Sequence, residues 1–143
     1  MSKSNVFENE FLSLVFNGTA ISNLADNAAT SPLTNLFVAL HTSDPGEAGN
    51  QSTSEISYTG YSRVSVARTS GGWTITNNSV SPVAAIEFGE MTGGTGGTAT
   101  FASIGTASSG SGKILYKGAL TPTVAVATGV IPRIKNTSTI TED

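Results

Sequence analysis

Leu36-Phe37-Val38-Ala39-Leu40-His41 is a nearly continuous apolar run in an otherwise polar chain. A run of this length and composition predicts a central strand that is buried on both faces. Turn residues follow it directly, since Ser43-Asp44-Pro45-Gly46 combines a proline, whose φ is already set for a turn, with a following glycine. The run is therefore the best candidate for the centre of the protein core.

Short segments with strand-like patterns, separated by turns rich in Gly, Ser and Asn, fill the rest of the chain. The predicted strands cover residues 61–68, 73–76, 83–88, 98–104, 113–120, 123–127, 130–134 and 138–141. The regular spacing of these strands predicts an all-β fold, a β-sandwich or jelly-roll-like domain of about eight to ten short strands. One amphipathic helix is expected before them.

The predicted helix begins near Asn5, because Asn5 and Glu8 have the spacing of a capping box, and it ends before Gly18. Its apolar residues recur with helical spacing and form one stripe: Phe7, Phe11, Leu14 and Val15. The stripe must pack either on the protein's own sheet, which we favour, or on a neighbouring subunit. Residues 19–34 are polar and read as a linker, so we expect an N-terminal arm (1–34) and a β-sandwich domain (35–143).

Composition narrows the possible functions. The 143 residues include 7 Lys plus Arg, 10 Asp plus Glu and no cysteine, for a net charge of −3. An acidic balance without a basic run argues against nucleic-acid binding, and the lack of cysteine excludes disulfides and thiolate metal sites. No apolar stretch approaches the ~20 residues of a membrane span, and a signal peptide is not expected.

Residues for catalysis or metal binding are few. The one histidine, His41, lies too close to Ser43 and Asp44 along the chain to form a catalytic triad with them, and we interpret it as bonded to its own turn. Carboxylates at Asp44, Glu47 and Glu55 are conceivable calcium ligands, but they lack the alternating spacing of a calcium loop. We therefore expect no enzyme activity, no cofactor and no metal.

An ordered set of motifs resembles a family of small tailed-phage virion proteins, often labelled tail-fibre or minor structural proteins, some of them similar to head decoration or cement proteins. The motifs are residues 36–46, Gly60-Tyr61-Ser62-Arg63, residues 104–120, Gly129-Val130-Ile131-Pro132 and residues 139–143. The family's usual Trp-Gly pair is replaced here by residues 101–105. The resemblance implies a virion protein, made in the host bacterial cytoplasm, without catalytic residues.

Three functions follow as expectations. The lead hypothesis is a head decoration or cement protein that binds the outer capsid surface and bridges capsid subunits. The alternative is a tail-associated or fibre-adaptor protein, and the second alternative is a carbohydrate-binding module that uses Trp73, Tyr58 and Tyr61. Expected partners are the major capsid protein or tail proteins and further copies of the chain, without nucleic acid or membrane. The predicted partner contacts are Phe7, Phe11, Leu14, Val15, Asp44, Glu47, Glu55 and Tyr58.

Overall fold

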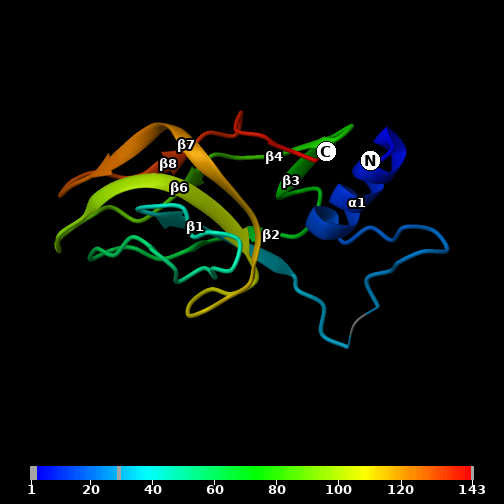
Figure 1. The fold of residues 1–143 in the computed structure, drawn as a ribbon, viewed down its shortest axis with the longest axis horizontal. Coiled ribbons are helices and arrows are strands. Elements are labelled where there is room, and N and C mark those ends of the chain that lie inside the picture. Colours follow the sequence, from blue (N-terminus) through cyan, green and yellow to red (C-terminus); the bar gives the residue numbers. More distant parts are fainter. Residues whose placement is uncertain (1–2, 29, 143) are drawn as a thin grey trace. The chain divides into compact units, whose positions relative to one another are not determined.

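The structure, a computed structural model, describes residues 3–28 and 30–142 (Figure 1). These residues form one helix and nine strands: α1 (Asn5–Asn17), β1 (Asn35–His41), β2 (Val64–Ala67), β3 (Trp73–Thr76), β4 (Ser79–Pro82), β5 (Ile86–Glu87), β6 (Gly97–Gly105), β7 (Ile114–Val126), β8 (Arg133–Ile134) and β9 (Ile140–Thr141). The predicted all-β fold with one N-terminal helix is confirmed. Its strands form sheets in the orders β2-β1-β6-β7, β3-β4-β9 and β5-β8.

Strand β1 is an inner strand of the four-stranded sheet, as its apolar sequence predicts. It pairs antiparallel with β6, in a register that runs from Phe37 opposite Gly105 to His41 opposite Phe101. Leu36, Val38 and Leu40 are each 1% exposed, and Ala39 between them is fully buried. Burial on both faces explains why this strand lacks the apolar–polar alternation of a half-exposed strand.

The residues group into two compact units. Unit 1 comprises Met1–Asn35, Val66–Ala85 and Lys135–Asp143, and unit 2 comprises Leu36–Ser65 and Ile86–Ile134. The chain first passes from unit 1 to unit 2 after Asn35, one residue from the predicted boundary after residue 34. Residues 66–85 and 135–143, which were predicted to belong to the β-sandwich domain, group with the helix in unit 1. That residues 35–143 form a domain by themselves stays a prediction.

Helix α1 has well-defined ends in unit 1. Ser4 precedes it in an extended conformation, and the Ser4 Oγ accepts a hydrogen bond from the Phe7 N–H at 3.4 Å. Gly18 follows it with φ 66°, and its N–H donates to the Ser13 carbonyl. The predicted cap at Asn5 is thus wrong by one residue: Asn5 is the first helical residue, and Ser4 supplies the capping oxygen.

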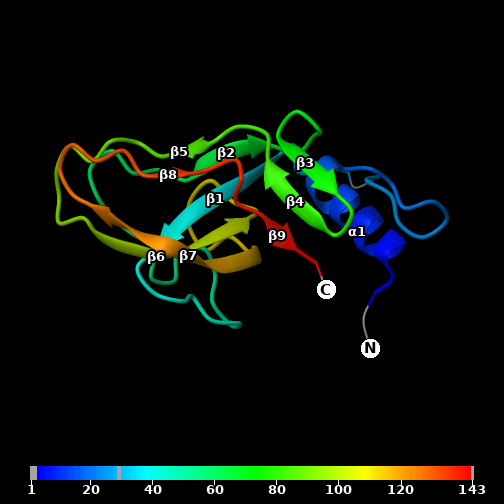
Figure 2. The ribbon, with the colours of Figure 1, turned by 90° about the horizontal axis from the view of Figure 1, so that it is seen from above.

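The buried face of α1 packs against the β3-β4 hairpin of its own chain (Figure 2). Glu8, Leu12 and Phe16 are its most buried residues, and Phe16 meets the ring of Trp73 edge-on at 4.9 Å between centroids. The predicted stripe of Phe7, Phe11, Leu14 and Val15 is only half-buried. The helix therefore packs within its own chain, and the face that packs most deeply lies beside the predicted stripe.

Arg68 closes the C-terminal end of this helix. Its guanidinium donates to the carbonyls of Val15 at 2.6 Å and Leu14 at 2.5 Å, and also to Asn27 Oδ1 at 2.8 Å. The last carbonyls of a helix lack partners within the helix, and a cation there is favourable. Through Asn27, Arg68 also connects the linker to the end of the helix.

The strand assignments around Pro82 need correction. Ser79–Pro82 is a strand, although the proline reads as punctuation, and of the predicted strand 83–88 only Ile86–Glu87 is one. Asn77, at φ 55°, turns the chain so that Trp73 lies opposite Pro82. Strand β9 pairs only with Ser79 and Val80, so the missing N–H of Pro82 costs no bond to β9.

Residues 113–120 and 123–127, predicted as two strands, form the single long strand β7. Its pairing with β6 is irregular at two places: Leu115 is an extra residue, and residues 120–123 lie opposite Thr100 alone. Pro122 lies in the second irregular stretch. Because β7 is an edge strand, the bulges and the proline make this edge a poor template for another strand.

The packing of α1 gives a first prediction. Leu12→Ala should lower the free energy of unfolding by about 2–5 kcal/mol, because Leu12 is fully buried and the substitution leaves a cavity. Val6→Ala is the control, since Val6 is 69% exposed, and should change it by less than about 0.5 kcal/mol. Urea unfolding followed by the fluorescence of the one tryptophan, Trp73, measures both. Equal effects would contradict the packing described.

Candidate functional site

A buried arginine, Arg63, holds two loops of unit 2 together. Its guanidinium makes a two-pronged ion pair with Glu55, with Nε to Oε1 and Nη2 to Oε2 both at 2.8 Å. The same group donates to the carbonyls of Ala107 at 2.9 Å and Gly110 at 2.6 Å. Pairing with Glu55 raises the pKa of Arg63. Residues 42–58 and residues 106–113, which we call the loop platform, are therefore joined by one side chain.

Tyr61 connects this ion pair to the central strand. Its hydroxyl donates to Glu55 Oε1 at 2.9 Å and accepts the Leu40 N–H at 3.1 Å. Burial raises the pKa of this phenol far above its usual value, so it stays protonated. Tyr61 thus acts as a neutral donor that fixes the orientation of the Glu55 carboxylate.

Gln51 joins the same two loops at a second point. It is fully buried, its Nε2 donates to the Phe37 carbonyl at 3.0 Å, and its Oε1 accepts the Ala107 N–H at 3.0 Å. A Cβ added at Gly105 or Gly112 would collide with the Gln51 side chain. These two glycines are therefore required by the close approach of the amide.

His41 is a third connection, and the sequence interpretation of its partners is wrong. Its ring is fully buried, with Nδ1 at 2.8 Å from the Thr53 carbonyl and Nε2 at 2.7 Å from Ser103 Oγ. The expected bond to the turn that follows it is not the one formed, because the loop returns to pair Glu55 with His41 and so brings Thr53 to the ring. Burial lowers the pKa of His41.

The Ser103–His41 pair has the spacing of a nucleophile and its base. Ser103 is only 1% exposed, however, and lies on β6 beneath the loop. A substrate cannot reach a hydroxyl that is buried in this way. The pair therefore serves as a structural connection between residues 42–58 and strand β6.

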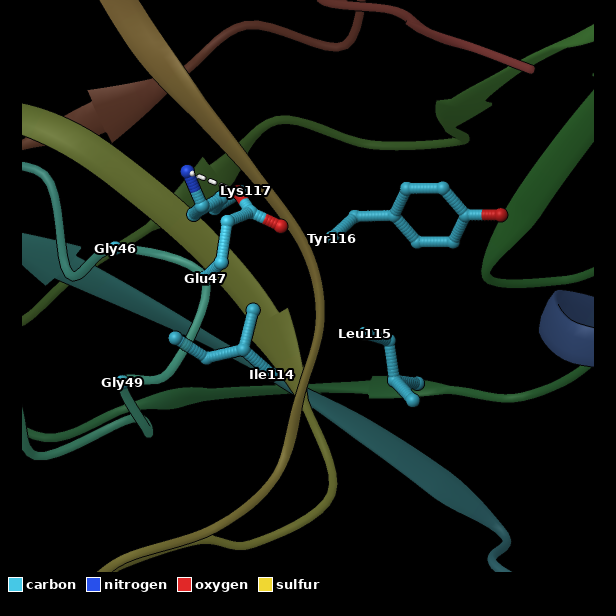
Figure 3. Close-up of a pocket in the computed structure, with 7 residues that line it drawn as sticks. All are labelled: Gly46, Glu47, Gly49, Ile114, Leu115, Tyr116 and Lys117. Carbon is cyan, nitrogen blue, oxygen red and sulfur yellow. Dashed lines mark ion pairs between the residues drawn. The ribbon is translucent and has the colours of Figure 1, made fainter. Parts of the chain in front are cut away.

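Two acidic residues of the platform remain at the surface beside a lysine of β7. The Lys117 ammonium lies 3.0 Å from Asp44 and 3.0 Å from Glu47, next to a shallow hollow of about 250 Å³. Figure 3 shows Glu47 meeting Lys117, while the ring of Tyr116 points away from them. The pKa of Asp44 is lowered, mainly by the Gly46 N–H and then by Lys117. This corner of the platform has one more carboxylate than it has cations.

The predicted contact residues are divided between the units. Phe7, Phe11, Leu14 and Val15 belong to unit 1, whereas Asp44, Glu47, Glu55 and Tyr58 belong to unit 2. Asp44 and Glu47 are exposed. Glu55 is engaged by Arg63, and Tyr58 is 7% exposed with its hydroxyl donating to the Gly89 carbonyl at 2.9 Å. Their roles in partner binding stay predictions.

Arg63 and Gln51 were not among the predicted site residues. Arg63 was one position of the predicted strand 61–68 and of the Gly60-Tyr61-Ser62-Arg63 motif, without a role assigned to its side chain, and Gln51 lay in a polar loop. Their partners are distant in sequence: Arg63 binds a carbonyl 47 residues away. A buried amide or guanidinium has no local pattern, so its position gives no signal before the fold is known.

The geometry also bears on the conceivable calcium ligands and on the carbohydrate-binding alternative. Asp44 and Glu47 form ion pairs with Lys117, and Glu55 forms one with Arg63. Within residues 3–28 and 30–142, no three His, Asp or Glu side chains are placed to hold a metal ion. Trp73 and Tyr58 are buried, and Tyr61 stacks on Phe88 with centroids 6.1 Å apart. These three rings do not form an exposed face for stacking on a sugar.

Comparison with known proteins identifies the class of protein. Residues 2–141 match the family described as podophage GP4 fiber I protein gp80, which is a class of tailed-phage virion structural protein. The match covers nearly the whole chain, so the chain belongs to this family. No curated protein matches it. No helix in the described part of the chain is long and apolar enough to cross a membrane.

The Arg63 cluster gives a second prediction. Arg63→Met should lower the free energy of unfolding by about 3–5 kcal/mol, because it removes the cation that pairs with the Glu55 carboxylate and the donors to two loop carbonyls. Arg133→Met is the matched control: the Arg133–Glu87 ion pair is half-exposed, and its loss should cost less than about 1 kcal/mol. Urea unfolding measures both variants. If Arg63→Met were as mild as the control, Arg63 would not hold the platform.

Proposed function

We propose that this protein is a tail-associated structural component of a podophage-type fibre, which works by binding other virion proteins. The observation that carries the proposal is the family match, whose description names a fibre protein. The lead hypothesis from the sequence, a head decoration protein, finds no support in that description. The tail-associated alternative is therefore the one we take forward.

The loop platform is the surface that we assign to this contact. Long loops usually carry function but lose conformational entropy when they bind. Here the buried side chains of Arg63, Gln51 and His41 hold the two loops by hydrogen bonds. Little conformational entropy therefore remains for the loops to lose on binding. The platform's outer surface is rich in exposed small and hydroxyl side chains, namely Ser43, Ser52, Ser54, Ser57, Ser108, Ser109 and Ser111.

Charge suggests the kind of partner that the platform accepts. Asp44, Glu47 and Lys117 together carry two negative charges and one positive charge, and the whole chain has a net charge of −3. Complementary charge steers association and selects the partner more than it adds affinity. The exposed Lys113 is a further cation of the platform, so the acidic excess is confined to the corner around Asp44 and Glu47. We therefore propose a partner that places a basic group against this corner. We also propose that the protein has no catalytic activity, since its Ser–His pair is buried.

Sedimentation with phage parts gives the third prediction. Purified protein should co-sediment with isolated tails and not with empty expanded capsids, at low and at moderate salt. Binding to capsids alone would contradict the proposal and restore the head decoration hypothesis. Binding to neither would contradict a direct contact with the assembled particle.

A pair of charge variants tests the surface. The Glu47 side chain is 94% exposed, so Glu47→Lys should leave the fold intact. The substitution should weaken tail binding by roughly two- to tenfold at low salt, and the effect should become smaller at higher salt because salt screens the charges. Glu90→Lys, at another exposed acid of unit 2, is the control and should bind like the unchanged protein. Equal binding by both variants would exclude this corner of the platform.

A further inference from the structure

His41 is placed so that its protonation state is coupled to the position of the loop above it. The Thr53 carbonyl can only accept a hydrogen bond, so Nδ1 carries the proton in the neutral ring. Nε2 is then an acceptor, and Ser103 Oγ donates to it at 2.7 Å. This assignment satisfies both ring nitrogens of a residue that is fully buried. A neutral ring is therefore complementary to its site.

We propose that His41 is an acid-sensitive latch, which adds to the hold on residues 42–58 against β1 and β6 while its ring is neutral and loosens that hold when its ring is protonated. A protonated ring has two donors and no acceptor, so the Ser103 hydroxyl loses the group to which it donates. The positive charge would also be fully buried. Both costs are relieved when Thr53 moves away and water reaches the ring, and water then replaces the Thr53 carbonyl as the acceptor of the Nδ1 proton.

The charged groups around the ring do not remove this cost. Burial has the largest effect on the pKa of His41, in the lowering direction. The Thr53 carbonyl, Glu55 and Asp44 favour the protonated ring, and Arg63 opposes it. Glu55 is already bound by Arg63 and Tyr61, and Asp44 by Lys117. Lys117 lies opposite Ser103 on β7, with its ammonium paired to Asp44 and Glu47. No nearby carboxylate is left to pair with the ring.

The direction of the pH effect follows from the lowered pKa. Above the ordinary histidine value of 6.5 the ring is neutral in both states, and the loop is held most firmly. As pH falls below 6.5, the open loop binds a proton that the closed loop does not, so opening increases by up to about tenfold per pH unit. The increase stops once pH passes the pKa of the closed state.

Nuclear magnetic resonance tests the latch directly, because His41 is the chain's one histidine and its ring signals need no separation from others. Ring nitrogen shifts should show the Nδ1–H tautomer at pH 8 and a midpoint below 6.5. Hydrogen exchange of the Ile56 and Thr42 amides, which bond to Leu40 and Ser54, should accelerate over the same range after correction for intrinsic rates. The Phe88 amide, bonded to Pro132, is the internal control.

His41→Gln supplies the second test, since a glutamine amide can donate and accept but stays neutral. In this variant the Ile56 amide should stay protected down to pH 5, without the acid-dependent acceleration. A ring that titrates at 6.5, or loop amides that stay protected after the ring is protonated, would overturn the proposal. If the variant does not fold, the titration of the unchanged protein still decides. Neither readout involves a phage partner, so the latch is tested independently of the proposed function.

Discussion

The ion pair between Arg63 and Glu55 is the interaction on which the loops of unit 2 depend. Burying a guanidinium costs several kcal/mol, and only a nearly complete set of hydrogen bonds offsets that cost. Glu55, the Ala107 carbonyl and the Gly110 carbonyl supply those bonds. Because each of them comes from a loop, the arginine can be buried only when both loops are in place. The loops and the ion pair therefore form together or not at all.

This arrangement fits a protein whose function is assembly. The chain places its polar chemistry below its surface, at Arg63, Gln51 and His41, and leaves small hydroxyl side chains and a few charges outside. Side chains that elsewhere perform catalysis or bind ligands serve here to fix loop geometry. The proposed contact with other virion proteins calls for a surface of constant shape, and these buried contacts provide one.

The sequence predicted the elements whose signals are local. The run at residues 36–41 was recognisable as an inner strand because burial on both faces leaves no polar positions, and helix α1 was recognisable by its periodicity. Strand β4 was missed because Pro82 normally marks a turn, and only the register with Trp73 shows that it fits. The partners of Arg63, Gln51 and His41 were missed for another reason. They lie up to 62 residues away, and no pattern within a short window reports such contacts.

Strand β7 has a consequence for how copies of this protein can meet. Its irregular pairing at Leu115 and at residues 120–123, together with Pro122, interrupts the ladder of backbone groups along the outer side of the sheet. Sharing of strands between neighbouring molecules is therefore disfavoured along β7. Contacts made there would depend on side chains, which differ at every position, and not on the backbone, which is the same in every protein. Such a molecule can be crowded in a host cell at high concentration and still join its correct neighbour rather than another copy at random.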